Sequence, residues 1–260
     1  METIAKFTRL FHPRGTERLL RLFYSPDKRQ NDYLETIIPY DKDLEICIDT
    51  RSFIEWQIFF KGYYELPTIN LIKKYLPKGG VFIDVGANIG NVSLIAAKIA
   101  SKVIAIEPVQ KFIDRIKRNF AINKMNNVSI LPFAASDKAG IVSFYAIKEG
   151  IANGMRGSFY QDHAKNETEE IQVEAKTLDE MLKDETRIDF IKIDTEGNDG
   201  RVILGSLKII EKHHPIIIFE YVEESWKSSG IEFPLIEDKL NSLGYKLKRI
   251  DDSNILCLPT

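Results

Sequence analysis

The sequence has few of the features that mark membrane, metal-cluster or secreted proteins. It contains only two cysteines, Cys47 and Cys257, in 260 residues. Two thiols are too few for an iron–sulfur cluster or a four-cysteine zinc site, and they provide no disulfide framework. No apolar run approaches the length of about 18 residues that a transmembrane helix needs. We therefore expect a cytoplasmic protein with no transmembrane segment.

The sequence also lacks a strong net charge, because 36 Lys and Arg residues nearly balance 38 Asp and Glu residues. Nucleic-acid-binding surfaces are usually basic, so nucleic acid is not an expected partner. The basic exception is the segment 1–25, which is predicted to form two short helices broken at Pro13 and Gly15. We interpret it as an N-terminal cap, and contact with a membrane surface or a partner helix is the alternative. The apolar residues that favour this alternative are Phe7, Leu10 and Phe11.

Runs typical of strands alternate with helical runs from residue 79 onward. This alternation predicts a mostly parallel sheet with helices on both faces, and a final hairpin adds one antiparallel strand. We expect a Rossmann-like α/β fold with a seven-stranded sheet in residues 79–260, and a helical and β cap in residues 1–78. The expected sheet strands are 81–85, 103–106, 128–135, 188–193, 216–219, 245–250 and 254–258. Helices are expected at 53–60, 71–76, 90–99, 109–122, 199–212 and 234–243, and shorter strands at 44–49, 141–147 and 171–175.

The most informative segment is Val81–Asn91, in which a buried strand leads into a turn with two glycines. The next strand ends in an acid, Glu107. A glycine-containing turn followed by such an acid is typical of adenosine-binding α/β folds. Gly86 and Gly90 are too widely spaced for the nicotinamide G-x-G-x-x-G pattern, and Asp84 precedes the turn. These departures favour S-adenosylmethionine over a nicotinamide cofactor.

Each residue of this region has an expected role toward the cofactor. Gly86 and Gly90 allow the backbone to approach it closely, and Asn88 bonds its polar tail. Asp84 accepts from its ammonium group directly or through water, while Glu107 binds the ribose hydroxyls. Two alternatives are a turn that serves only packing and an NAD site. The predicted cofactor-binding residues are Asp84, Gly86, Ala87, Asn88, Gly90, Glu107, Pro108, Ala135, Ser136 and Asp194.

The candidate catalytic residues follow from the chemistry of methyl transfer, in which the protein positions the acceptor and manages its proton. Such residues must lie at the carboxyl edge of the sheet. Asp194 and Glu196 leave one strand there, and Glu220 ends the next. Lys192 lies in a strand expected to be buried, so we expect it to pair with Asp194 or Glu220. A structural turn is the alternative for Asp194 and Glu196, and no third ligand accompanies Asp194 and Glu220, so no metal is expected.

Substrate-binding candidates come from two segments outside the strands. The polar stretch 148–170 is too long for a simple connection, and we interpret it as a lid over the acceptor, with a surface loop as the alternative. It contributes Arg156 and His163. Tyr64 and Glu65, just before the first strand, are expected at the mouth of the pocket or in the packing of the cap.

Six short segments occur in an order that resembles the FkbM-type S-adenosylmethionine-dependent methyltransferases. The resemblance covers about residues 40–222, and the segment around Lys192 is its most specific part. It departs from the family pattern at Thr195–Asp199, where Asn198 is expected to alter the pocket floor. The segments are Phe59–Glu65, Asp84–Gly90, Ile106–Pro108, Asn119–Asn123, Ala134–Asp137 and Lys192–Gly197.

The resemblance implies an enzyme that methylates a hydroxyl of a saccharide or another polar small molecule, with S-adenosylmethionine as cofactor and S-adenosylhomocysteine as product. The expected partner is therefore a small-molecule or glycan acceptor. Two alternatives stay open, namely a non-catalytic module that binds a cofactor or partner and an NAD-dependent enzyme. The identity of the acceptor, the base and the oligomeric state are not fixed by the sequence.

Overall fold

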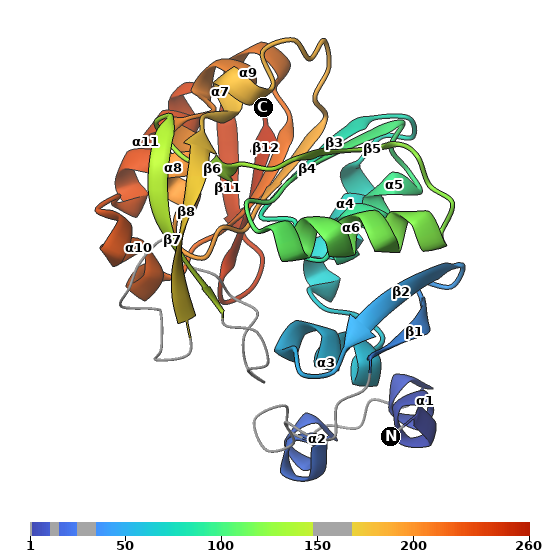
Figure 1. Ribbon diagram of the computed structural model, residues 1–260. Helices are drawn as coiled ribbons and strands as arrows, with labels where there is room; N and C mark the ends of the chain where they lie inside the picture. Colours follow the sequence, from blue (N-terminus) through green and yellow to red (C-terminus); the bar gives the residue numbers. More distant parts are fainter. Residues whose placement is uncertain (1, 11–15, 25–34, 148–167) are drawn as a thin grey trace.

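A seven-stranded sheet forms the centre of the protein (Figure 1). The computed structural model describes residues 2–10, 16–24, 35–147 and 168–260. The strand order is β11-β12-β10-β9-β3-β4-β5, and β12 is antiparallel to both neighbours while the other pairs are parallel. The predicted Rossmann-like sheet with one antiparallel strand is thus confirmed. The strands are β3 (Val81–Val85), β4 (Lys102–Ile106), β5 (Val128–Leu131), β9 (Phe190–Ile193), β10 (Ile216–Glu220), β11 (Tyr245–Arg249) and β12 (Asn254–Pro259).

Successive side chains of the central strands face opposite sides of the sheet and enter two cores. Phe82 and Phe190 pack in the first core, whereas Ile83 and Ile191 pack in the second. Helices earlier in the chain cover the first face, and later helices cover the second (Figure 1). The first set is α3 (Phe53–Lys61), α4 (Leu66–Tyr75), α5 (Asn91–Ala97) and α6 (Gln110–Ile122). The second set is α7 (Leu178–Met181), α8 (Asp199–Leu204), α9 (Leu207–His213), α10 (Glu223–Ser229) and α11 (Phe233–Ser242).

The N-terminal part adds two helices and a hairpin to the first face. The helices are α1 (Glu2–Leu10) and α2 (Thr16–Tyr24), and the hairpin pairs β1 (Glu35–Tyr40) with β2 (Leu44–Asp49). The indole of Trp56 on α3 donates a hydrogen bond of 2.7 Å to the carbonyl of Tyr24. Phe7 is 61% exposed, and Phe11 lies outside the described residues, so a membrane or partner contact stays a prediction.

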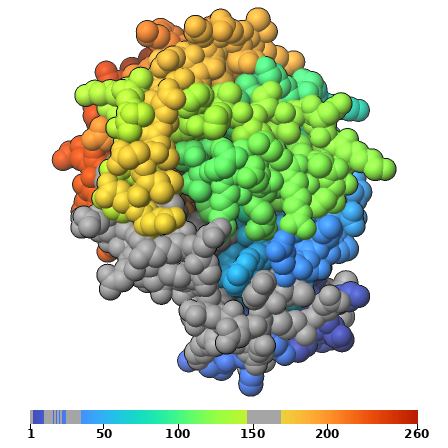
Figure 2. Space-filling view, in the orientation of Figure 1, coloured from blue at the N-terminus to red at the C-terminus, as the bar shows by residue number. Residues whose placement is uncertain are grey.

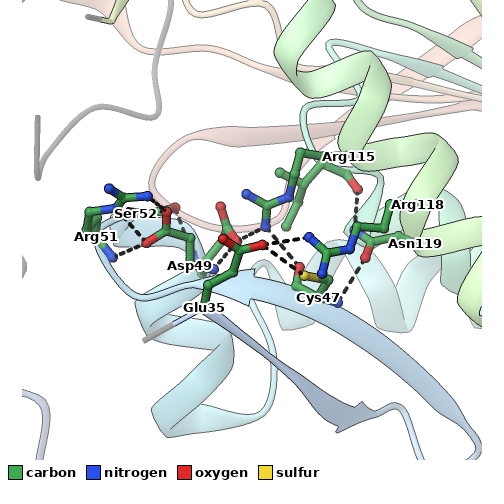
Figure 3. A network of polar contacts seen from close by, with 10 residues as sticks. Glu35, Cys47, Asp49, Arg51, Ser52, Arg115, Arg118 and Asn119 are labelled. Atoms are coloured by element: carbon green, nitrogen blue, oxygen red, sulfur yellow. Dashed lines mark hydrogen bonds and ion pairs between the residues drawn. The ribbon is translucent and has the colours of Figure 1, made fainter. Parts of the chain in front are cut away.

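The hairpin is fastened to the sheet domain through polar contacts with helix α6 (Figure 3). The Asn119 carboxamide accepts from the Cys47 amide at 2.9 Å and donates to the carbonyl of Ile89 at 2.9 Å. Arg115 donates to the Cys47 carbonyl at 3.0 Å and forms an ion pair with the buried Glu55. Asn119 thereby links the hairpin, which is part of the predicted cap, to the turn that follows β3.

A third sheet packs beside helix α6. It contains β6 (Ala134–Ala135), β7 (Gly140–Ile147) and β8 (Thr168–Lys176), in the order β6-β8-β7. Phe144 of β7 and Val173 of β8 belong to a small separate core of the β7–β8 hairpin, against which Phe112 of α6 packs. Figure 2 shows the β7–β8 hairpin and α6 next to each other on one face of the molecule.

Several predicted boundaries are wrong. The strand expected at 128–135 is two strands in different sheets, because Pro132 has no amide to continue the ladder. The helix expected at 199–212 is divided at Gly205, where a Cβ would lie 2.2 Å from the Ser136 carbonyl oxygen. Helix α10 and strand β1 were not predicted. In the described ranges, no helix is both long and apolar enough to cross a membrane.

Candidate active site

A cleft with an empty volume of about 780 Å³ opens at the carboxyl ends of β3, β4 and β9. Most of the residues that the sequence singled out line it. Apolar side chains from the cap and the third sheet complete its walls, and sequence reasoning missed these because they come from elements distant in the chain. The predicted residues in the lining are Tyr64, Glu65, Gly86, Ala87, Asn88, Glu107, Pro108, Ala135, Lys192, Asp194 and Glu196. The additional apolar ones include Ile54, Phe112, Phe133 and Phe144.

The turn after β3 leaves no room for a side chain at Gly86. Its φ is +76°, and a Cβ would lie 1.9 Å from the carbonyl oxygen of Asp194. The amides of Gly86 and Ala87 both donate to the Ile106 carbonyl, at 3.0 and 3.2 Å. The turn is therefore held between the ends of β4 and β9, with its backbone along the cleft.

Glu107 joins the end of β4 to this turn. It is 5% exposed, and its two carboxylate oxygens accept from the amides of Asn88 and Val109 at 2.9 and 3.0 Å. Burial raises the pKa of Glu107 to about 7, although the two amide hydrogen bonds favour the ionised form. Each carboxylate oxygen has a second lone pair, so Glu107 retains the capacity to accept from hydroxyls in the cleft.

Lys192 is the centre of a cluster of charges beneath the cleft. Its ammonium lies 3.2 Å from the Asp194 carboxylate and 3.8 Å from those of Glu65 and Asp84. Burial disfavours the charged amine, but the three carboxylates outweigh burial and hold the pKa of Lys192 well above its ordinary value. The predicted pair with Asp194 is confirmed, whereas the other two contacts were missed.

Asp84 lies below the cleft rather than in its wall. Its side chain is completely buried, one oxygen accepts from the Ser93 hydroxyl at 2.6 Å, and the other accepts no hydrogen bond. Burial raises the pKa of Asp84. The contact with Lys192 follows from the register of the sheet, in which Asp84 and Lys192 are partners on the adjacent parallel strands β3 and β9. A role of Asp84 toward a cofactor would be exerted through water or Lys192.

Glu65 enters the same cluster from the cap. It precedes helix α4 in a left-handed conformation, with φ +56°. Burial, opposed by Lys192 and reinforced by Asp194, raises the pKa of Glu65 to about 8. A left-handed conformation is uncommon for a non-glycine residue, and here it brings a carboxyl group of the cap to the carboxyl edge of the sheet.

The turn after β9 is supported from behind by two buried polar side chains. Asp199 accepts from the amides of Thr195 and Gly197, each at 3.3 Å, and burial raises its pKa to about 7. Asn198 donates to the carbonyl of Ala135 at 2.8 Å. Because Ala135 lines the cleft, the departure from the family pattern at Asn198 contacts the pocket wall.

Other predicted residues lie elsewhere. Gly90 precedes helix α5, and a Cβ at this position would lie 3.3 Å from the Ile116 side chain. The main-chain oxygen of Glu220 accepts from the indole of Trp226 at 3.0 Å. Within the described segments, no cluster of three or more His, Cys, Asp or Glu residues is placed to hold a metal ion. The predicted residues that do not line the cleft are Asp84, Gly90, Ser136 and Glu220. Arg156 and His163 lie outside the described residues.

The fold and the cleft together define a Rossmann-like α/β protein of the methyltransferase class, with its site beyond the carboxyl ends of the central strands. Residues 84–247, more than half of the chain, match the methyltransferase FkbM domain. The chain belongs to the FkbM methyltransferase family.

Several solved methyltransferase structures are similar to the chain. Methyltransferase FkbM from Methylobacillus flagellatus KT is 16% identical, with 69% of this chain and 43% of that chain covered and a TM-score of 0.45. The chain thus spans less than half the length of that relative. SMU.1697c from Streptococcus mutans, solved in complex with SAH, is 10% identical over 73% of this chain and 94% of that chain, with a TM-score of 0.48. No curated protein sequence matches the chain.

Proposed function

We propose that the protein is an S-adenosylmethionine-dependent methyltransferase that acts on a hydroxyl of a saccharide or another polar small molecule. The observation that carries the proposal is Glu107, a buried acid on the cleft whose carboxylate is fixed to the glycine turn. This arrangement suits an adenosine, because the acid accepts from ribose hydroxyls while the turn at Gly86 offers only backbone to the ligand.

The residues of the cleft fit such a cofactor. Glu107 would hold the ribose, the backbone at Gly86 and Ala87 would lie against the body of the molecule, and Asn88 would bond its polar tail. When bound, the cofactor supplies a methyl group on a positively charged sulfur. The protein has to orient the acceptor and take its proton, and Asp194 and Glu196 lie in the cleft wall for those tasks.

The lining of the cleft favours a neutral acceptor. Tyr64, Phe133 and Phe144 offer aromatic faces against which an apolar sugar face can pack. Among the described residues the charged part of the lining is mostly acidic, which opposes phosphate groups and therefore nucleic acid. The charged residues of the lining are Glu65, Glu107, Lys192, Asp194 and Glu196.

A cytoplasmic location is part of the proposal. Cys47 and Cys257 are both buried and free. Unpaired thiols are the usual state in reducing compartments, which supports this location.

The decisive experiment is a thermal-shift titration with S-adenosylmethionine, S-adenosylhomocysteine and NAD. A ligand that binds the folded state only, at about 100 times its Kd, adds about 2.7 kcal/mol of stability. We expect the two adenosyl ligands, and not NAD, to raise the Tm. Glu107→Ala should weaken their binding about 10- to 100-fold, because it removes a charge-assisted hydrogen bond.

The matched control is Glu211→Ala, which removes an exposed acid on helix α9. It should bind both ligands as the wild type does. Glu107→Gln retains the shape of the side chain if the alanine variant fails to fold. A Tm that responds to NAD alone would favour the nicotinamide alternative, and binding without transfer to any hydroxyl acceptor would favour a non-catalytic module.

Transfer itself is tested with cofactor carrying a labelled methyl group and a panel of neutral methyl glycosides with their phosphorylated counterparts. We expect a labelled methyl ether on a neutral member, detected by mass spectrometry. Label confined to phosphorylated members would contradict the preference for a neutral acceptor.

A further inference from the structure

Two glutamates in the lining of the cleft have a left-handed backbone. Seven non-glycine residues of the described ranges have a positive φ. Four of them lie in the β1–β2 turn or just after the end of a helix, where this conformation is ordinary, namely Asp41, Lys42, Lys124 and His214. Asparagine, here Asn88, adopts it more readily than most residues. The remaining two are Glu65 and Glu196, and both line the cleft.

The start of helix α4 does not account for the conformation of Glu65. A residue directly before a helix is usually extended, and its side chain caps the first amides. Glu65 has φ +56° and ψ +44°, and its side chain makes no capping hydrogen bond. Its carboxyl group instead lies 3.8 Å from the ammonium of Lys192, which also lines the cleft. The side chain of Glu65 therefore serves the cleft and not the helix.

Glu196 is held in its conformation by a buried acid behind the turn. Its φ is +54°. The amides of its two neighbours, Thr195 and Gly197, each donate to a different oxygen of the Asp199 carboxylate, and Asp199 is completely buried. The turn thus fixes the backbone on both sides of Glu196, while Glu196 itself forms part of the cleft wall.

This conformation has a cost that glycine would avoid. A left-handed residue with a Cβ is less stable than a glycine at the same position, because the Cβ crowds the backbone. Strain of this kind is typical of ligand-binding sites, where the side chain is needed for the ligand. Glu65 comes from the cap and Glu196 from the turn after β9, so the two side chains reach the cleft from separate elements.

We propose that Glu65 and Glu196 are the acceptor-binding residues of the cleft, and that each accepts a hydrogen bond from a different hydroxyl of one acceptor molecule. This inference rests on the proposed function and narrows its acceptor to a polyol. Tyr64, next to Glu65 in the lining, offers an aromatic face to the same molecule. A carboxyl group accepts from a hydroxyl whether or not it carries a proton, so the raised pKa of Glu65 does not prevent this contact.

The test measures kcat/KM for the neutral methyl glycoside that is methylated fastest and for each of its monodeoxy analogues. In the wild type, removal of either bound hydroxyl should lower kcat/KM about 10- to 100-fold, because an acceptor in the cleft wall is left unpaired. Glu65→Gly should remove the dependence on one of these hydroxyls, and Glu196→Gly the dependence on the other. A side chain with only a structural role would not change which hydroxyls matter.

Glycine removes the carboxyl group and relieves the left-handed strain in one change, so both variants are expected to fold. An unchanged Kd for S-adenosylhomocysteine reports an intact cleft. The matched control is Lys124→Gly, which relieves the same conformation at an exposed position after α6 and should leave every kcat/KM value unchanged. Glu65→Asn and Glu196→Asn carry a shorter side chain on a left-handed backbone, and they replace the glycine variants if these fail to fold.

An unchanged hydroxyl dependence in either variant overturns the role of that glutamate and leaves the methyltransferase proposal intact. The inference as a whole is overturned if all monodeoxy analogues react like the parent glycoside, or if methylation is confined to acceptors with a single hydroxyl. Methylation of no glycoside by a protein that binds S-adenosylmethionine overturns it as well. A protein that binds neither adenosyl ligand overturns both proposals.

Discussion

At the scale of single residues, the glycine turn shows which positions tolerate no side chain. Gly86 and Gly79 have nearly the same left-handed φ, +76° and +74°, but different surroundings. A Cβ at Gly86 would collide with the Asp194 carbonyl, whereas nothing lies within 4 Å of a Cβ at Gly79. Alanine substitutions at the two positions therefore distinguish the cost of a left-handed backbone from the cost of a steric clash.

We expect Gly79→Ala to lower the free energy of unfolding by about 1–2 kcal/mol, the cost of a left-handed alanine. Gly86→Ala should lower it by about 3–5 kcal/mol, because the end of β9 must also move. Urea denaturation measures both, and the Gly86 variant alone should lose binding of S-adenosylhomocysteine. Equal losses of stability would show that the Asp194 carbonyl yields without cost.

Lys192 gives a pH-dependent prediction. Lys192→Met removes the ammonium group that lies 3.8 Å from the buried carboxyl groups of Glu65 and Asp84, and breaking a buried pair in this way costs about 3–5 kcal/mol. The folded-state pKa values of these carboxyl groups then lie above their unfolded values, so the folded state binds more protons and stability falls as pH rises. We expect the loss in free energy of unfolding to be larger at about pH 8 than at about pH 5.5. A loss of stability that is independent of pH would contradict the raised pKa values of the carboxyl groups around Lys192.

At the scale of elements, helix α6 connects the β1–β2 hairpin to the glycine turn after β3. Asn119 and Asn123 lie one turn apart on this helix and bond successive parts of β2. Asn119 contacts the buried Cys47 amide and the Ile89 carbonyl, while Asn123 contacts the exposed backbone of Glu45. The asparagine at position 119 therefore bonds buried backbone groups, whereas the asparagine at position 123 bonds exposed ones.

We expect Asn119→Ala to cost about 2–3 kcal/mol of stability, because it leaves a buried donor and a buried acceptor unpaired. Asn123→Ala should cost less than about 1 kcal/mol, because water replaces its partner groups. Chemical denaturation gives both values. Binding of S-adenosylhomocysteine should also weaken in the Asn119 variant, since Ile89 lies in the turn that we propose binds the cofactor. An unchanged affinity would show that the contact between α6 and Ile89 does not affect binding.

At the scale of the whole molecule, the predicted cap and the sheet share one core. Trp56 and Phe60 from the cap belong to the same hydrophobic cluster as Phe82 and Phe190 of the sheet. Glu65 also reaches across this boundary to Lys192. The division at residue 78 stays a prediction, and these contacts argue that the two parts fold together.

A chain that begins at residue 79 should therefore fail to form a cooperative fold, because it lacks α3, α4 and the N-terminal elements that complete the first core, and the part of the sheet face they cover would be exposed. The full chain should unfold in a single transition by calorimetry. A fragment of residues 79–260 that unfolds cooperatively and binds S-adenosylhomocysteine would contradict this expectation and support an autonomous catalytic domain.

The centre of the sheet was predictable because β3, β4, β9 and β10 are short apolar runs that end at, or directly before, a glycine or an acidic residue. Strand β1 escaped prediction because Pro39 interrupts an edge strand, and α10 did so because its residues are mostly polar, with Trp226 as its buried anchor. The glycine-containing turn after β3 was recognisable from local sequence. The contact of Glu65 with Lys192 was not, because it depends on how the cap packs on the sheet.

The interruption at Pro132 has a consequence for redesign. It sends the chain out of the central sheet into the β7–β8 hairpin, which has a separate small core and places Phe144 in the cleft wall. The hairpin is consequently an exchangeable part, whereas the glycine turn after β3 and the acids Glu107 and Asp194 directly follow strands of the central sheet. Grafting hairpins from relatives onto this frame is the economical route to enzymes with new acceptors and an unchanged methyl donor.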